Sequence, residues 1–184
     1  MILIRHGESE FNAVFNRTRK DPGITDPKLT AHGKEQVRRA AAVIRRDGHP
    51  IQRLITSPYT RALETAVILA EELKLPVEVE PIVHEHACWT CDIGTPISTL
   101  AEKWPALDFS YLAEIWWPEN EPQESVHRRC SDFRVKAAQL NDWRHVGVVS
   151  HWGFIRTLTG LDVKNAEVVK FDPTVSPSVS PYVL

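Results

Sequence analysis

Short apolar blocks alternate along this chain with longer segments in which apolar residues recur every three or four positions. Continuous apolar blocks are typical of strands buried on both faces of a sheet, and the helical spacing is typical of helices with one buried face. The predicted strands cover residues 2–4, 51–56, 77–80, 146–150 and 167–171. The predicted helices cover residues 30–46, 58 to about 76, 125–142 and 154–159. This alternation predicts an α/β fold, a three-layer sandwich with a mostly parallel central sheet flanked by helices.

Residues that favour helix ends mark several of these boundaries. Thr30 is a predicted N-cap, and Gly48 and Gly160 are predicted helix stops. Ser57 and Pro58 are predicted to serve as N-cap and first residue of the second helix.

Two internal segments follow neither pattern. Residues 10–28 contain Asp-Pro-Gly and Asp-Pro breakers and are predicted to be irregular. Residues 83–121 are dense in Cys, Trp, Pro and Gly and are predicted to form an irregular lid insertion, with a short helix at 98–103. The Pro/Ser/Val-rich tail after residue 171 predicts no regular structure. Because no internal repeat or linker interrupts the chain, residues 1–184 are predicted to form one domain.

Composition and charge narrow the classes of partner. The chain is 42% hydrophobic and has a net charge of -2, so it offers no basic field that would gather nucleic acid. No apolar run approaches the roughly 20 residues that span a bilayer, and no signal-peptide pattern precedes the first strand. The three cysteines, Cys88, Cys91 and Cys130, cannot all pair, which fits a reducing compartment. We expect a cytoplasmic protein with no nucleic-acid and no membrane partner, and a homodimer is compatible with the sequence.

Basic side chains follow several predicted strands directly. Arg5 and His6 end the first strand, and His151 ends the strand at 146–150. Arg61 lies one turn into the helix that follows the second strand. Because the carboxyl ends of parallel strands meet at one edge of the sheet, these four side chains are expected to converge. Two arginines and two histidines predict an electropositive pocket for a phosphoryl group.

The motifs that carry these residues resemble a known family. Residues 3–8 (Leu-Ile-Arg-His-Gly-Glu), the stretch 56–62 (Thr-Ser-Pro-x-x-Arg-Ala) and the pair Ser150-His151 are similar to the three signatures of the histidine phosphatase superfamily, in order and spacing. Residues 29–36 also match the start of the family's first helix. Residues 122–125 resemble its Pro-Gly-Glu-Ser segment, with glutamine in place of glycine. The resemblance covers residues 2 to about 160.

The resemblance implies roles for particular residues. His6 is the nucleophile that becomes a phosphohistidine, and Arg5, Arg61 and His151 clamp the transferred group. Glu85 takes the place of the proton donor for the leaving oxygen, with Asp92 as the reserve candidate. No cofactor and no metal are implied.

Further residues are candidates for substrate binding. Asn12 matches a family position that helps to bind phosphate or substrate, and Ser57 belongs to the second signature. Trp152 could narrow the pocket or stack on an organic leaving group. Arg17, Arg19 and Lys20 could contact a second acidic group of the substrate, although a solvated loop explains them equally well.

Other interpretations of the sequence remain open. His84, His86, Cys88 and Cys91 suggest a zinc site, but they crowd into eight residues without a second Cys-x-x-Cys. Within the family, a phosphatase acting on a small phosphorylated molecule is preferred. The alternatives are a cofactor-dependent phosphoglycerate mutase-like phosphotransferase and a non-catalytic phosphate-binding member. Residues 16–20 begin like the mutase stretch but depart from it at Thr18. The sequence does not identify the substrate.

Overall fold

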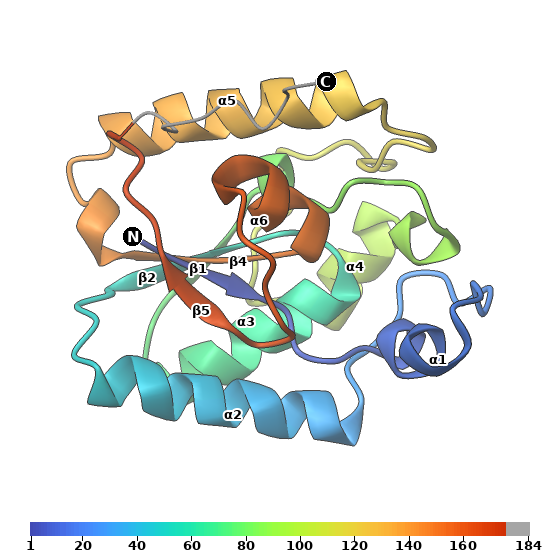
Figure 1. Cartoon of the computed structure of the whole chain (residues 1–184), viewed down its shortest axis with the longest axis horizontal. Helices are drawn as coiled ribbons and strands as arrows, with labels where there is room; N and C mark the ends of the chain where they lie inside the picture. The colour runs from blue at the N-terminus through green and yellow to red at the C-terminus, as the bar shows by residue number, and fades with distance from the viewer. Residues whose placement is uncertain (176–184) are drawn as a thin grey trace.

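The computed structural model describes residues 1–175 and has a five-stranded sheet at its centre (Figure 1). The strand order is β3-β2-β4-β1-β5. Four strands run parallel: β1 (Ile2–Arg5), β2 (Arg53–Thr56), β3 (Val77–Val79) and β4 (Val146–Ser150). The fifth, β5 (Val168–Lys170), pairs antiparallel with β1. The α/β prediction with a mostly parallel sheet is therefore confirmed.

Helices cover both faces of this sheet (Figure 1). The pair α2 (Ala31–Arg46) and α3 (Thr60–Leu73) lies on one face, and α5 (Gln123–Gln139) and α6 (Trp152–Thr159) lie on the other. Alternate strand residues point into two separate apolar cores, as the pleat requires. Leu3 and Val148 pack towards α5 and α6, whereas Ile4 and Val149 pack towards α2 and α3. The predicted three-layer sandwich is confirmed.

The predicted caps of α2 and α6 are confirmed. The Thr30 hydroxyl accepts a hydrogen bond from the Gly33 N–H at 2.9 Å. Gly48 and Gly160, both with positive φ, follow the two helices. Gly33 has a further role, because a Cβ there would lie 2.1 Å from the Glu8 carbonyl oxygen. The small residue lets α2 begin directly against the turn that follows β1.

The prediction that residues 10–28 are irregular is wrong over their first half. Helix α1 (Glu10–Thr18) begins there. Ser9 caps it, since its hydroxyl accepts from the Asn12 N–H while the Asn12 amide oxygen accepts from the Ser9 N–H. Phe11 is buried beneath the helix. The Pro-containing breakers act only after this first helix.

The predicted start of α3 is also wrong. The helix begins at Thr60 with Tyr59 as its N-cap residue, two positions beyond Pro58. The cap comes from a distant part of the chain, because the Asp26 carboxylate accepts from the Thr60 N–H at 2.8 Å and from its hydroxyl at 2.7 Å. Local sequence contains no signal for such a cap.

The insertion at 83–121 is largely irregular but well packed. It begins within the single turn η1 (Pro81–Val83) and contains the turn η2 (Thr90–Asp92) and the short helix α4 (Ile97–Lys103). Leu100 and Phe109 are buried against Leu63 of α3 in a third apolar cluster. Another turn, η3 (Trp143–His145), leads into β4. Of the tail predicted after residue 171, residues 176–184 lie outside the described residues.

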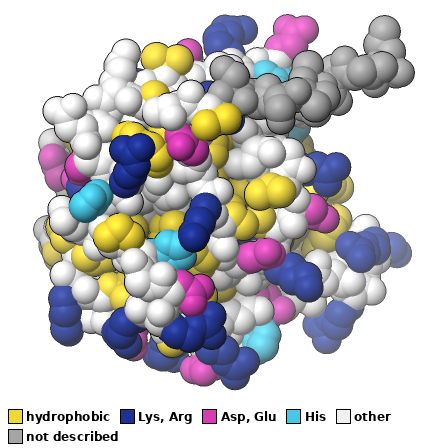
Figure 2. Space-filling model, turned by 60° about the vertical axis from the view of Figure 1, so that its left-hand side comes forward, with side chains coloured by type: hydrophobic (Ala, Val, Ile, Leu, Met, Phe, Trp, Pro, Cys, Tyr) yellow, Lys and Arg dark blue, Asp and Glu magenta, His cyan; other side chains and the backbone are white. Residues whose placement is uncertain are grey.

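The described surface has mixed charge. On the face in Figure 2, Lys and Arg side chains are interspersed with Asp and Glu side chains. Among residues 1–175, no helix combines the length and the apolar character needed to cross a membrane.

Candidate active site

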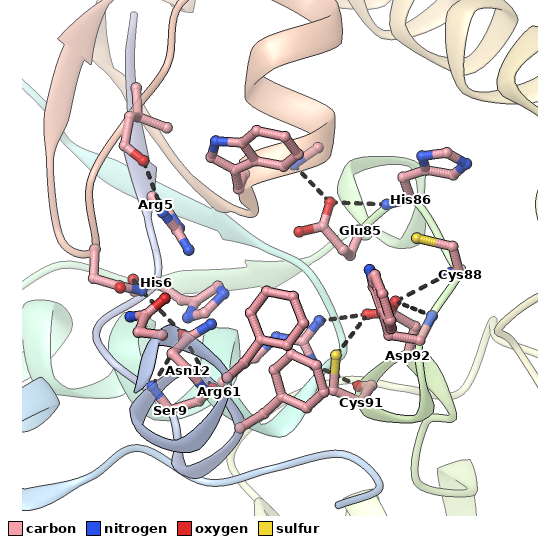
Figure 3. A pocket seen from close by; sticks show the side chains of 18 of the residues that line it. Arg5, His6, Ser9, Asn12, Arg61, Glu85, His86, Cys88, Cys91 and Asp92 are labelled. Atoms are coloured by element: carbon pink, nitrogen blue, oxygen red, sulfur yellow. Dashed lines mark hydrogen bonds and ion pairs between the residues drawn. The ribbon is translucent and has the colours of Figure 1, made fainter. Parts of the chain in front are cut away.

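A pocket of about 820 Å³ lies at the carboxyl ends of β1 and β4. Its floor is formed by Arg5, His6 and Arg61, and its walls come from α1, the segment 85–92, the start of α6 and residues 162–165 (Figure 3). His151, the remaining member of the predicted clamp, does not line the pocket, but its ring centroid lies 5.1 Å from that of His6. The four basic groups predicted to converge do so.

A single hydrogen bond fixes the tautomer of His6. Its Nδ1 lies 2.7 Å from the Gly7 carbonyl oxygen, which can only accept, so Nδ1 carries the proton and Nε2 keeps a lone pair. Burial, and then the positive charges of Arg61 and Arg5, lower the pKa of His6 well below its usual value. A neutral imidazole with a free Nε2 is the nucleophilic form.

His151 is a buried polar side chain without a partner. It is fully buried, and within residues 1–175 neither ring nitrogen makes a hydrogen bond. Burial lowers the pKa of His151 well below its usual value, which keeps the ring neutral. A buried polar group that lacks a hydrogen bond costs free energy unless a ligand supplies one. Arg5 Nε is a second buried donor that makes no hydrogen bond to the described residues.

The two arginines are held differently. Arg61 is 2% exposed and donates to the Cys91 carbonyl at 2.7 Å and to Asp92 Oδ1 at 2.9 Å. Burial is the largest single influence and acts to lower its pKa, but Asp92 and the weaker influences of other nearby groups together outweigh it, so the pKa of Arg61 is raised. Arg5 donates to the Val163 carbonyl at 2.7 Å and has no carboxylate within ion-pair distance in the described chain. Both guanidinium groups line the pocket.

Glu85 has one oxygen committed and one free. Oε1 accepts from the N–H groups of His86, Gly153 and Phe154, two of them at the start of α6. Oε2 makes no hydrogen bond to the described residues and points into the pocket (Figure 3). Burial, and then the negative charge of Asp92, raise the pKa of Glu85 above its usual value. The free oxygen is therefore suited to carry a proton.

Asp92, the reserve candidate for the acid, is fully engaged. Its Oδ1 accepts from Arg61, and its Oδ2 accepts from the N–H groups of Cys88 and Trp89 at 3.1 and 3.0 Å. The side chain is 2% exposed. The geometry makes Asp92 the anchor of Arg61 and leaves the free carboxyl oxygen to Glu85.

The substrate-binding candidates divide into two pairs. Asn12 and Trp152 line the pocket, and the Asn12 amide oxygen is fixed by Ser9 and by Asn165, so that its Nδ2 has no partner among the described residues. Ser57 and Arg17 are not brought to the pocket wall. Ser57 is fully buried and caps the N–H of Tyr59, and Arg17 is exposed and donates to a carbonyl of its own helix.

Of the basic candidates near the end of α1, Arg19 lines the pocket and Arg17 does not, because the left-handed backbone at Arg19 (φ 54°) ends the helix and turns the chain. Other pocket residues are missed by sequence reasoning. Lys164 and Asn165 come from the connection before β5, and Asn165 Nδ2 donates to the His6 carbonyl at 3.1 Å. That connection carries no motif, so no sequence signal marks it.

The residues of the zinc interpretation have other partners. The ring of His84 contacts the Glu85 carbonyl, and that of His86 contacts the Glu121 carbonyl. Within residues 1–175, no three His, Cys, Asp or Glu side chains are arranged to hold a metal ion. The pKa values of the Cys88 and Cys91 thiols are raised by burial, that of Cys88 to about 11.

Comparison with known proteins agrees with this geometry. Residues 1–176 match the family model described as histidine phosphatase superfamily (branch 1). The chain belongs to this superfamily. A curated histidine phosphatase relative, phosphoserine phosphatase 1 of Hydrogenobacter thermophilus, is 31% identical over 157 residues, which are 82% of this chain and 70% of the relative.

Two further comparisons give a partial sequence match and a shared fold. A 2,3-bisphosphoglycerate-dependent phosphoglycerate mutase of Nitrosococcus oceani is 38% identical, but over only 42% of this chain and 32% of its own length. The solved structure of an ecdysone phosphate phosphatase of Bombyx mori has a TM-score of 0.68 at 17% identity, covering 98% of this chain and 96% of that one, which shows the shared fold. The family and its phosphatase members support a phosphatase enzyme.

Proposed function

We propose that this chain hydrolyses the phosphomonoester of a small organic molecule through a phosphohistidine on His6. The observation that carries the proposal is the free Nε2 of a neutral, buried His6 beside two arginines and opposite a free carboxyl oxygen of Glu85. These are the nucleophile, the charge clamp and the proton donor that phosphoryl transfer needs.

The first step transfers the phosphoryl group to the enzyme. His6 Nε2 attacks phosphorus, and the N–P bond forms as the ester P–O bond breaks. The leaving oxygen takes the proton from Glu85 Oε2 and departs as an alcohol. Arg5, Arg61 and a ring N–H of His151 hold the non-bridging oxygens, which supplies the hydrogen bonds that Arg5 Nε and His151 lack.

The second step returns the enzyme to its starting state. A water molecule gives a proton to the Glu85 carboxylate and attacks phosphorus, so the N–P bond breaks and inorganic phosphate leaves. The Gly7 carbonyl keeps the proton on His6 Nδ1 throughout, and Nε2 recovers its lone pair. The uncommitted Asn12 Nδ2 is placed to bind the phosphate or the ester oxygen.

Water is the proposed acceptor of the phosphoryl group. A mutase would instead transfer this group to a second hydroxyl. The support is that the phosphatase relative matches 82% of this chain, whereas the mutase matches 42%. We also propose that the enzyme needs no metal, because two guanidinium groups supply the charge that a divalent cation supplies elsewhere. The three free thiols support a cytoplasmic location.

Rapid quenching with a ³²P-labelled phosphomonoester tests the proposal. We expect an acid-labile, base-stable phosphoenzyme that His6→Ala abolishes together with turnover. His32→Ala, at an exposed histidine of α2, is the matched control and should behave as the parent. Wild-type turnover by His6→Ala would refute the proposal, and loss of activity on exhaustive chelation would refute its metal-independent part.

A further inference from the structure

The mouth of the pocket is lined by aromatic rings. On α1, Phe11 and Phe15 stack with their centroids 5.4 Å apart and their planes 15° from parallel. Trp89 meets the Phe15 ring edge-on at 5.3 Å. Trp152, the first residue of α6, also lines the pocket, and the ribbons of α1 and α6 lie on either side of the catalytic side chains in Figure 3.

Two of these rings are partly exposed to solvent. Trp89 is 48% exposed and Trp152 is 37% exposed. Large apolar groups that stay exposed beside a functional pocket commonly mark a surface that a ligand covers. Two basic side chains of the pocket lining, Arg19 and Lys164, are exposed and form no ion pair with the described residues.

The Trp152 ring and the Trp89 backbone are held in place without a ligand. The Trp152 Nε1 donates to Asp162, and the Arg156 guanidinium lies 4.9 Å from the centroid of the Trp152 ring. The Trp89 backbone is fixed by Asp92, which also anchors Arg61. Rigid aromatic walls bind a flat apolar group with little further loss of conformational entropy.

We infer that this mouth is a subsite for an aromatic leaving group, so that the substrate is a phosphate ester of an alcohol that bears an aromatic ring. The inference rests on the proposed phosphatase function, because the ester oxygen must reach Glu85 while the ring lies between α1 and the start of α6. Burial of the ring and its contacts with the aromatic side chains supply the binding free energy.

The test compares two phosphate esters whose leaving alcohols have similar basicity. Cleavage of the ester P–O bond is then intrinsically about as easy in one ester as in the other. The pair is 1-naphthylmethyl phosphate and glycerol 3-phosphate. We expect kcat/KM to be at least about 30-fold higher for the naphthylmethyl ester, chiefly through a lower KM, given the apolar area and ring contacts available. A ratio below about threefold would overturn the inference.

Substitutions of the two tryptophans test whether these rings cause the difference in kcat/KM between the two esters. Trp152→Ala and Trp89→Ala should each lower the ratio about five- to tenfold, the scale of one aromatic contact. Trp152→Phe should retain most of the ratio, which guards against a general disturbance of α6. Val135→Ala, at an exposed apolar residue of α5, is the control and should leave the ratio unchanged. Equal losses on both esters would contradict the subsite.

A binding measurement separates this inference from the proposed function. Naphthylmethylphosphonate cannot be hydrolysed and should bind at least about tenfold more tightly than methylphosphonate. If that preference holds but no ester is hydrolysed, the subsite stands and the phosphatase proposal fails. If esters are hydrolysed without the preference, only the subsite fails.

Discussion

The floor and the mouth of the pocket are built on different principles. His6 and Arg61 on the floor, and His151 beside His6, follow β1, β2 and β4 closely and are almost completely buried. The mouth is formed by α1 and by connections such as 162–165, and its Trp89 and Trp152 rings are partly exposed. The sheet fixes the groups proposed to bind the phosphoryl group, which is the same in every phosphomonoester. The connections contact the rest of the substrate, where members of one fold can differ.

The largest effects are expected on the floor, where the two arginines can be compared directly. Arg5→Ala and Arg61→Ala should each lower kcat by about 10²–10³, the scale of a lost transition-state donor. Only Arg61→Ala should also lower the free energy of unfolding, by about 3–5 kcal/mol, because it leaves the buried Asp92 carboxylate without its partner. Denaturant unfolding and steady-state kinetics measure both.

A double variant sharpens this comparison. Arg61→Ala combined with Asp92→Asn should recover much of the stability but none of the activity, since no unpaired charge remains and the amide oxygen can still accept from the Cys88 and Trp89 N–H groups. If the double variant is as unstable as Arg61→Ala, the ion pair is not the reason for the loss.

Glu85→Gln is expected to have the next largest effect, and it should depend on the leaving group. On an alkyl phosphate the variant should lose about 100-fold in kcat, the usual scale of general acid catalysis. On p-nitrophenyl phosphate, whose leaving oxygen needs little protonation, the loss should be much smaller. Equal losses on both substrates would mean that Glu85 positions the site and does not donate a proton.

The pH profile gives a second measure of the same residue. Because the pKa of Glu85 is raised and that of His6 is lowered, the acid is protonated while the nucleophile is neutral over a wider range of pH than ordinary values allow. Activity on an alkyl phosphate should fall as the pH rises through the Glu85 pKa, and Glu85→Gln should remove that fall. An unchanged alkaline limb in the variant would assign it to another group.

Gly153→Ala should produce a smaller version of the Glu85 defect. A Cβ at this position would lie 2.5 Å from Glu85 Oε1, so the carboxyl group must move from the N–H groups that orient it. We expect a loss of about tenfold in kcat on alkyl phosphates, below the full contribution of the acid. The loss should be weaker on p-nitrophenyl phosphate. A defect that is the same on both substrates would indicate general damage to α6.

The sequence predicts the floor far better than the mouth, for physical reasons. β4 is predicted to the residue because a strand buried on both faces must be a continuous apolar block. The catalytic side chains follow such strands, so their convergence can be derived from topology. Helix α1 escapes prediction because it is short and depends on the Ser9–Asn12 cap. Asn165 is unpredictable because it reaches His6 from 159 positions away in the chain.

Substitutions of Arg17 and Arg19 at the mouth are expected to have the smallest effects on activity. The sequence offers both arginines as contacts for a second acidic group, whereas the structure places Arg19 on the pocket wall and directs Arg17 along its own helix. Both side chains are exposed, so solvent screens their charges and neither should exceed the roughly 1 kcal/mol typical of surface electrostatics. We expect Arg19→Ala to change kcat/KM by about two- to fivefold on substrates with a second acidic group, and Arg17→Ala to leave it within error. Both variants should keep the parent's kcat on methyl phosphate, which has no such group. A larger effect of Arg17→Ala than of Arg19→Ala would show that the chain turns differently after α1 when substrate is bound.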